Sequence, residues 1–147
     1  MSKQRVFISS RITEMRDFRE AAVRAIESAG MEPIYFAGKM IPPPKTDLEH
    51  LTQLLDGVKS CDIFIGLYGQ TLDPNWTPEG YSKHSMELEQ ETAESLGLRC
   101  LYYVEPLNIQ CDHDMTEFRE RIVQKGAEFL TTTDDLYQSL LTQLSTS

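Results

Sequence analysis

The chain has 147 residues, a length that suits one domain with a single hydrophobic core. Its 40% hydrophobic and 25% charged residues are typical of a globular protein. The net charge of −9, with no basic stripe, argues against duplex nucleic acid as a partner, and no apolar run reaches the roughly 20 residues of a membrane span. We therefore expect one domain over residues 1–147 that binds neither nucleic acid nor membrane.

The cysteines indicate the compartment. Cys61, Cys100 and Cys111 have no paired spacing, which is typical of reduced thiols in the cytoplasm. The N-terminus enters a strand-like run directly, without the apolar stretch of a signal peptide, and this also predicts a cytoplasmic protein. The cluster at residues 111–114 (Cys-Asp-His-Asp) lacks a second ligand pair, so no metal site is predicted.

The first third of the chain predicts a strand, a helix and a second strand. Residues 5–9 are a short apolar run, and residues 15–29 carry apolar side chains at helical spacing. Gly30 is expected to end that helix as a C-cap residue. Residues 31–36 read as a second strand, and Pro33 predicts that this strand lies at a sheet edge or that it begins there.

The middle of the chain contains the strongest strand signal. Residues 37–46 include three successive prolines and are predicted to be a stiff loop. The next helix, over residues 48–58, can be capped by Thr46 or Asp47. Residues 61–69 are almost continuously apolar, which suits the centre of a parallel sheet.

A long loop then leads to the second half. Loops of the length of residues 70–83 are uncommon in compact domains and are often functional. The remaining elements are predicted to be a helix around residues 85–96, a strand at 100–104, a helix at 115–122, a short strand at 128–130 and a helix at 136–144.

This order of elements predicts a flavodoxin-like α/β fold. Strands that alternate with helices favour a parallel sheet covered by helices on both faces, a three-layer sandwich. Right-handed crossovers favour four or five strands in the order 2-1-3-4-5. In that order, the crevice at the carboxyl ends of strands 1 and 3 is the expected ligand site.

Polar residues follow both of these strands. Ser9, Ser10 and Arg11 leave strand 1, and Tyr68 and Gly69 leave strand 3. Hydroxyls and loop amides suit ribose and phosphate oxygens, and an arginine can bind phosphate with two hydrogen bonds. Two alternatives stay open, namely that the serines cap the following helix and that the glycines, including Gly66, serve only packing and turns.

Glu89 stands out on the helix that follows the long loop. It falls on an apolar stripe with Met86, Ala93 and Leu96. An ionised carboxylate that faces the interior is costly unless it is paired or lines a wet pocket, so Glu89 is a candidate site residue. An alternative stripe would place Glu89 at the edge of the buried face, and it consists of Ser85, Leu88, Thr92 and Leu96.

Other residues admit plainer roles. Trp76 and Tyr81 can stack on a base or pin the long loop, and His84 can cap a helix or contact a ligand. We expect Arg19 to form a structural ion pair. Asp62 opens the central strand at its amino end, far from the crevice, and is expected to pair locally.

The chain resembles a domain-of-unknown-function family that precedes NACHT- or STAND-type NTPase modules in signalling and immunity proteins. The resemblance covers roughly residues 4–105 and is carried by residues 6–10 (VFISS), 19–23 (REAAV), 62–69 (DIFIGLYG) and 87–97. It implies a fold similar to TIR domains and nucleoside deoxyribosyltransferases. Those relatives cleave an N-glycosidic bond with a glutamate that lies four residues before an alanine, here Glu89 and Ala93. Related sequences have Ser or Thr three residues before that glutamate, whereas this chain has Met86.

Two functions are compatible with these features. The first is a TIR-like signalling or immunity domain that binds a nucleotide such as NAD in the crevice and acts by self-association or by contact with an NTPase module. The second is an N-glycosidase or transferase, with NAD or a nucleoside as substrate and no cofactor. Its catalytic residue is Glu89, and its substrate-binding residues are Ser9, Ser10, Arg11, Tyr68, Gly69 and Ser85. Walker, Gly-x-Ser-x-Gly, His-Glu-x-x-His and Gly-rich dinucleotide motifs are all missing from the sequence.

Overall fold

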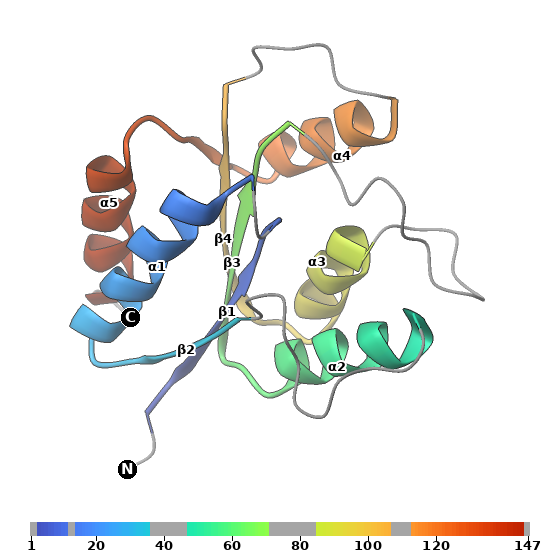
Figure 1. Cartoon of the computed structure of the whole chain (residues 1–147), viewed down its shortest axis with the longest axis horizontal. Coiled ribbons are helices and arrows are strands. Elements are labelled where there is room, and N and C mark those ends of the chain that lie inside the picture. Colours follow the sequence, from blue (N-terminus) through green and yellow to red (C-terminus); the bar gives the residue numbers. More distant parts are fainter. Residues whose placement is uncertain (1–2, 12–13, 36–46, 71–84, 107–112, 146–147) are drawn as a thin grey trace.

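The computed structural model describes residues 3–11, 14–35, 47–70, 85–106 and 113–145 (Figure 1). Within them, strands alternate with helices along the chain. The strands are β1 (Arg5–Ser9), β2 (Glu32–Ile34), β3 (Ile63–Tyr68), β4 (Arg99–Val104) and β5 (Glu128–Phe129). The helices are α1 (Arg16–Ser28), α2 (Asp47–Lys59), α3 (Ser85–Ser95), α4 (His113–Gln124) and α5 (Thr133–Ser145).

The strands form one parallel sheet in the order β2-β1-β3-β4-β5. This confirms the predicted flavodoxin-like topology. β3 is buried along its whole length and lies between β1 and β4, as the apolar run at residues 61–69 predicted. The carboxyl ends of β1 and β3 are therefore neighbours, and the strand order reverses between them.

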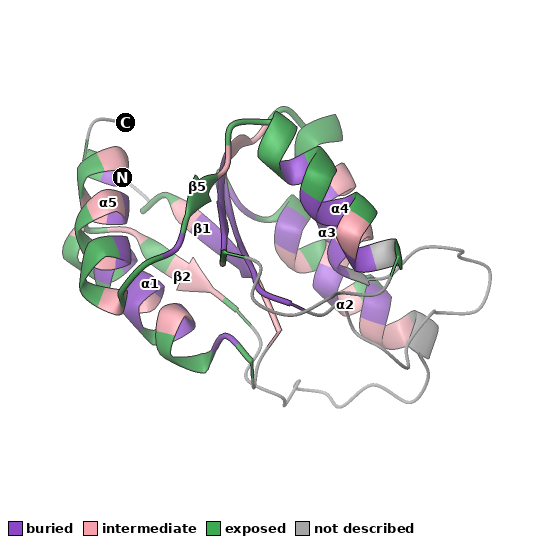
Figure 2. Cartoon of the chain, turned by 90° about the horizontal axis from the view of Figure 1, so that it is seen from above, coloured by how far each residue is buried: buried purple, intermediate pink, exposed green. Residues whose placement is uncertain are grey.

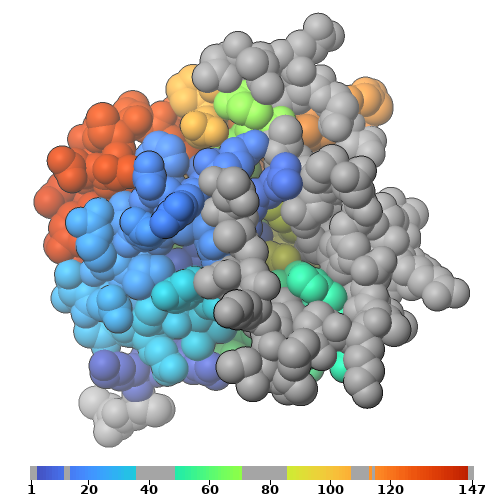
Figure 3. All heavy atoms as spheres, in the orientation of Figure 1, coloured from blue at the N-terminus to red at the C-terminus, as the bar shows by residue number. Residues whose placement is uncertain are grey.

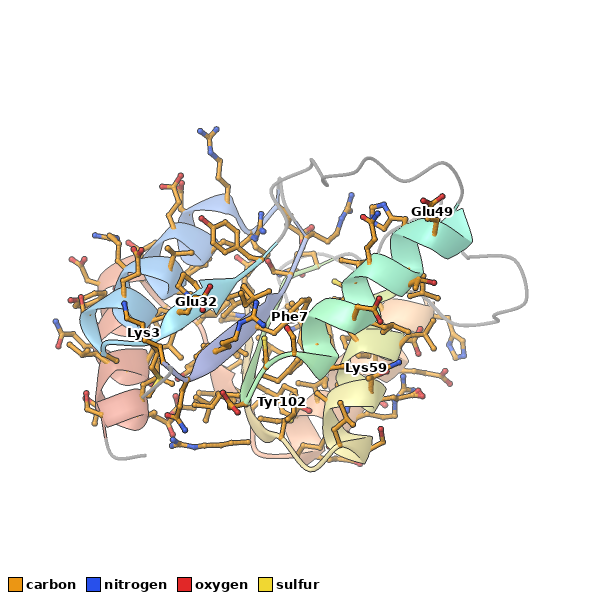
Figure 4. The ribbon with its side chains drawn as sticks, turned by 90° about the horizontal axis from the view of Figure 1, so that it is seen from below. Lys3, Phe7, Glu32, Glu49, Lys59 and Tyr102 are labelled. Atoms are coloured by element: carbon orange, nitrogen blue, oxygen red, sulfur yellow. The ribbon has the colours of Figure 1, made fainter. Side chains whose placement is uncertain are left out.

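Helices cover both faces of the sheet, α1 and α5 on one face and α2, α3 and α4 on the other (Figures 1 and 2). Alternate residues of β3 supply the two cores, because successive side chains of a strand point to opposite faces. Ile63 and Ile65 pack towards α1 and α5. Phe64 packs towards α2, α3 and α4, where Phe7 stacks on it and Tyr102 meets it edge-on. Figure 4 shows Phe7 and Tyr102 on this side of the sheet.

On the other face, α1 and α5 pack side by side and form a continuous part of the molecular surface (Figure 3). Ser28 and Tyr137 share a hydrogen bond of 2.9 Å between their hydroxyls. The Arg24 guanidinium lies over the Tyr137 ring, 5.7 Å from its centroid. These contacts join the two helices at the rim of their apolar interface.

The predicted edge strand is confirmed, and α1 ends close to the predicted position, with Ala29 and not Gly30 as its C-cap residue. Gly30 follows α1 with φ of 78°, a left-handed conformation that glycine adopts without strain. The N–H groups of Gly30 and Met31 donate to the carbonyls of Glu27 and Ile26, which closes the helix. β2 lies at the sheet edge, where a proline, which has no backbone N–H, is tolerated.

No helix in the described ranges is both long enough and apolar enough to cross a membrane. The predicted proline-rich loop at residues 37–46 lies outside the described residues, as does the long loop beyond Gln70.

Candidate functional site

Buried polar side chains from separate elements meet at the carboxyl ends of β1 and β3. Ser9 ends β1, Tyr68 ends β3 and Glu89 lies in α3, with exposures of 1% for Ser9 and 5% for Glu89. The Tyr68 hydroxyl donates to Ser9 Oγ at 3.4 Å. Burial raises the pKa of Tyr68 well above its ordinary value, the bond with Ser9 opposes this, and the Glu89 carboxylate adds to the rise. Tyr68 is therefore protonated and lies within the electrostatic field of Glu89.

Gly66 makes this arrangement sterically feasible. Ser9 and Gly66 are partners across the β1–β3 ladder, and Tyr68 lies two residues further on the same face as Gly66. A Cβ atom on Gly66 would lie 2.5 Å from Tyr68 Cε2 and 2.7 Å from its hydroxyl oxygen. The phenol thus folds back over Gly66 to reach Ser9. The sequence left close backbone approach and plain sheet packing open for Gly66, and no local pattern revealed its role beside Tyr68.

Glu89 occupies the buried face of α3. Met86, Glu89 and Ala93 are all buried, so the stripe that placed the carboxylate inward is confirmed for them. Leu96 was predicted on the same stripe, but it is 49% exposed because α3 ends at Ser95. Leu88 and Thr92 of the alternative stripe are only partly buried. The carboxylate therefore belongs to the inner face of the helix.

Arg19 is a site residue that the sequence prediction missed. It is 8% exposed, and its guanidinium carbon lies 5.6 Å from the centroid of the Tyr35 ring. Burial lowers the pKa of Arg19, whereas Tyr35 and the Glu89 carboxylate both act to raise it. Arg19 thus lies within the electrostatic field of Glu89.

A sequence signal for Arg19 exists. It lies on the apolar stripe of α1 between Met15 and the buried Ala22, just as Glu89 lies on that of α3. Opposite charges on two apolar stripes could have been read as partners.

The two residues after β1 differ in their surroundings. Ser10 Oγ is buried and has no hydrogen-bond partner among the described residues. Arg11 is partly buried, and its carbonyl accepts from the Met15 N–H just before α1. Met15 is the N-cap residue, without a side-chain capping bond, so the alternative that Ser9 and Ser10 cap α1 is wrong. Both hydroxyls instead lie at the carboxyl edge of the sheet.

Gly69 belongs to a second polar cluster beside the first. A Cβ atom on Gly69 would clash with the carboxylates of Glu14 and Glu105. The Gln70 N–H donates to Glu14 Oε1 at 2.9 Å, and Arg119 donates to the carbonyls of Gly69 and Glu105. Burial and the neighbouring Glu14 raise the pKa of Glu105. Gly69 therefore lies between this carboxylate pair and Arg119, in a cluster apart from Ser9 and Tyr68.

Contacts with α4 and β4 fix the position of α3. Arg121 pairs with Glu87 at 2.9 Å, and Lys125 pairs with Glu94 at 3.0 Å. The buried Gln90 donates to the Tyr102 hydroxyl at 3.4 Å. These contacts lie on both sides of Glu89 along α3, so they hold this part of the helix against the sheet.

Several predicted residues cannot be placed. Ser85 begins α3, but its side chain lies outside the described part of the structure. Trp76, Tyr81 and His84 lie outside it as well. Cys111 and Asp112 are also outside them. Among the residues that the structure describes, no group of three or more His, Cys, Asp or Glu side chains could hold a metal ion. Asp62 pairs locally as expected, accepting from the Arg5 N–H at 3.0 Å.

Comparisons with known proteins agree with this fold. The profile of a family described as a domain of unknown function, DUF4062, matches residues 5–145. No curated protein matches the sequence. The fold is similar to the CMP N-glycosidase BcmB of Clostridium botulinum, with 15% identity, a TM-score of 0.55, and coverage of 93% of this chain and 98% of that one. It is also similar to diflavin flavoprotein A3 of Nostoc sp., with 12% identity, a TM-score of 0.50, and coverage of 99% and 91%.

Proposed function

We propose that this chain, which belongs to the DUF4062 family, is a nucleotide N-glycosidase with Glu89 as its catalytic residue. The observation that carries the proposal is the buried carboxylate of Glu89, held with Ser9, Tyr68 and Arg19 at the topological switch point. This is the crevice in which an open α/β sheet binds its ligand. The fold similarity to a CMP N-glycosidase supports the same class of reaction.

The chemistry requires a negative charge beside the sugar. As the N-glycosidic bond breaks, its electron pair leaves with the base and positive charge develops at C1′. A carboxylate in a site of low dielectric constant stabilises this charge while water adds to C1′, or it attacks C1′ and forms a glycosyl ester that water then hydrolyses. In both routes water supplies the hydroxyl at C1′, and with CMP its proton goes to the departing cytosine. Glu89 is placed to perform either role.

The neighbours of Glu89 prepare its carboxylate for this role. A buried carboxylate tends to become protonated, because burial disfavours the charged form. The attraction that Glu89 exerts on Arg19 acts equally on the carboxylate and favours its ionised form.

We take the substrate to be a nucleotide such as CMP, with NAD as the second candidate. Ser10 Oγ has no partner among the described residues and is available to a sugar or phosphate oxygen. Arg11 follows it and can meet a phosphate through its guanidinium.

The experiment is incubation of the purified chain with CMP, NAD and cytidine, followed by chromatography for the free base. We expect release of cytosine or nicotinamide, and loss of at least 100-fold in rate for Glu89→Gln, an estimate that follows from removal of one charge-stabilising group. The matched control is Glu91→Gln on the same helix, which should retain activity. Release that persists in Glu89→Gln, or no release from any substrate, would contradict the proposal.

A second candidate function is a signalling domain that binds a nucleotide without cleaving it. Met86 is buried in the apolar core at the position where the family resemblance implies Ser or Thr. That position therefore offers no hydroxyl to the crevice. Calorimetric binding of NAD or CMP without base release, together with self-association or binding to an NTPase module in light scattering, would favour this function.

A further inference from the structure

A hollow of about 240 Å³ lies beside β5, where residues of β4, β5 and α5 line it. The core under α1 and α5 includes its lining residues Tyr103 and Leu136, whereas Glu89 lies in α3 on the opposite face of the sheet. The polar and aromatic side chains of the hollow are those of Tyr103, Glu128, Phe129, Thr131, Asp135 and Ser139. The hollow is therefore separate from the proposed N-glycosidase site and has its own chemistry.

A chain of hydrogen bonds ends on Glu128. Ser139 Oγ donates to Glu128 Oε2 at 2.9 Å, because an ionised carboxylate only accepts. A serine has one proton to donate, so in its 2.9 Å bond with Tyr103 the phenol is the donor. Burial raises the pKa of Tyr103, which keeps the phenol protonated. Gln143 in turn donates to the Tyr103 oxygen at 3.4 Å, so the whole chain is directed towards the carboxylate and stabilises its negative charge.

Neither carboxylate of the hollow has a cation beside it among the described residues. Glu128 accepts from Ser139, and Asp135 accepts from Thr131 Oγ1 at 2.6 Å, both of which are neutral hydroxyls. The ion pairs of the described ranges involve other acids. Both carboxylates are exposed, and each can accept further hydrogen bonds. The hollow thus presents two negative groups to whatever enters it.

β5 adds an apolar wall and an open edge. Phe129 is 58% exposed, which is more than any other large apolar side chain of the described residues. β5 is the last strand of the sheet, and its described pairing is with β4 alone. Figure 2 shows it exposed at the surface. An edge strand offers its free N–H and C=O groups to a further strand.

The occupant that fits these features is cationic, flat and carried by an extended chain. A guanidinium is planar and always charged, donates to two carboxylates at once and stacks on an aromatic ring. We propose that the hollow is a docking site for an arginine side chain of a partner protein, on an extended segment that lies along β5. Charge complementarity favours a partner other than a second copy, because two chains of net charge −9 repel each other.

The test uses the capped peptide acetyl-Val-Arg-Val-amide as the probe, titrated into the whole chain and followed by the NMR shifts of backbone amides. The matched peptide carries citrulline, which has the shape of arginine without its charge. We expect the arginine peptide to bind at least about fivefold more tightly, as an exposed ion pair allows, and to shift the amides of Phe129 and Ser139.

A variant pair then tests the carboxylate. Glu128→Gln should reduce the preference for arginine to less than about twofold, while its amide oxygen still accepts from Ser139. Asp134→Asn is the matched control, since Asp134 is an exposed acid of α5 that does not line the hollow. It should leave the preference unchanged.

Four results would overturn the proposal. They are absence of binding, equal affinity for the two peptides, a preference that survives Glu128→Gln, and shifts confined to amides away from the hollow. Agmatine, a free guanidinium compound, separates the sources of the cation, because agmatine that binds as tightly as the peptide would make a small cation the ligand in place of a partner strand. A dimer in light scattering that Phe129→Ser abolishes would assign the face to a second copy and would also overturn the proposal.

Discussion

Substitution of Gly66 by alanine should displace the Tyr68 phenol. The new methyl group would lie 2.5 Å from Cε2 and 2.7 Å from both Cζ and the hydroxyl oxygen. Tyr68 has little room to move, because its ring meets Phe118 edge-on at a centroid distance of 4.8 Å and is fully buried. Overpacking of this kind costs about 1–3 kcal/mol. The displaced ring should also lose its hydrogen bond to Ser9.

A double-mutant cycle isolates this clash. Leucine at position 68 lacks the three atoms that the methyl group would meet, so Gly66→Ala on a Tyr68→Leu background should cost less than about 0.5 kcal/mol. The measurement is urea unfolding of the four proteins, followed by circular dichroism. An equal cost of Gly66→Ala on both backgrounds would refute the reasoning, since the strain would then arise from another neighbour or from the strand itself.

Two further predictions concern the charged groups. Arg19→Met should lower the rate of base release at least tenfold, because the buried Glu89 loses a stabilising cation. Far-ultraviolet circular dichroism of the variant should stay unchanged. A rate within twofold of wild type would contradict this prediction. Burial and Glu14 raise the pKa of Glu105 above its ordinary value of 4.5, so the folded state holds this proton more tightly than the unfolded state. Stability from this group is therefore present below pH 4.5 and is lost as the pH rises through the folded-state pKa. In urea titrations, Glu105→Gln should reduce the slope with which the unfolding free energy falls between pH 4 and pH 7. An unchanged slope would show that the pair of Glu14 and Glu105 does not cause this fall.

Local sequence signals were sufficient for most of the architecture. The run at residues 5–9 is β1, the apolar run at 61–69 is the central strand, and Gly30 ends α1 where a left-handed conformation is needed. Strand order followed because alternating strands and helices with right-handed crossovers leave few parallel arrangements. For Glu89, helical periodicity left two stripes open, and the burial of Met86, Glu89 and Ala93 in the structure selects the one that faces inward.

Periodicity was less reliable at element ends. Leu96 fits the stripe of α3 by spacing, but the helix stops at Ser95 and Gly97 then adopts a positive φ of 72°. A side chain beyond the last turn no longer follows the helical repeat. The second strand was likewise predicted over residues 31–36, whereas it spans Glu32–Ile34.

The sequence by itself determined the order and type of the elements and the buried face of most of them, because these depend on spacing along the chain. Only the tertiary structure decided which polar groups meet. Tyr68 reaches Ser9 across 59 positions of sequence, and it does so because Gly66 leaves space for the ring. The Glu89 carboxylate also raises the pKa of Arg19, although the two residues lie on helices that cover opposite faces of the sheet. Such contacts depend on the register between strands and on the depth at which each helix packs, and these quantities exist only when the whole sheet has formed.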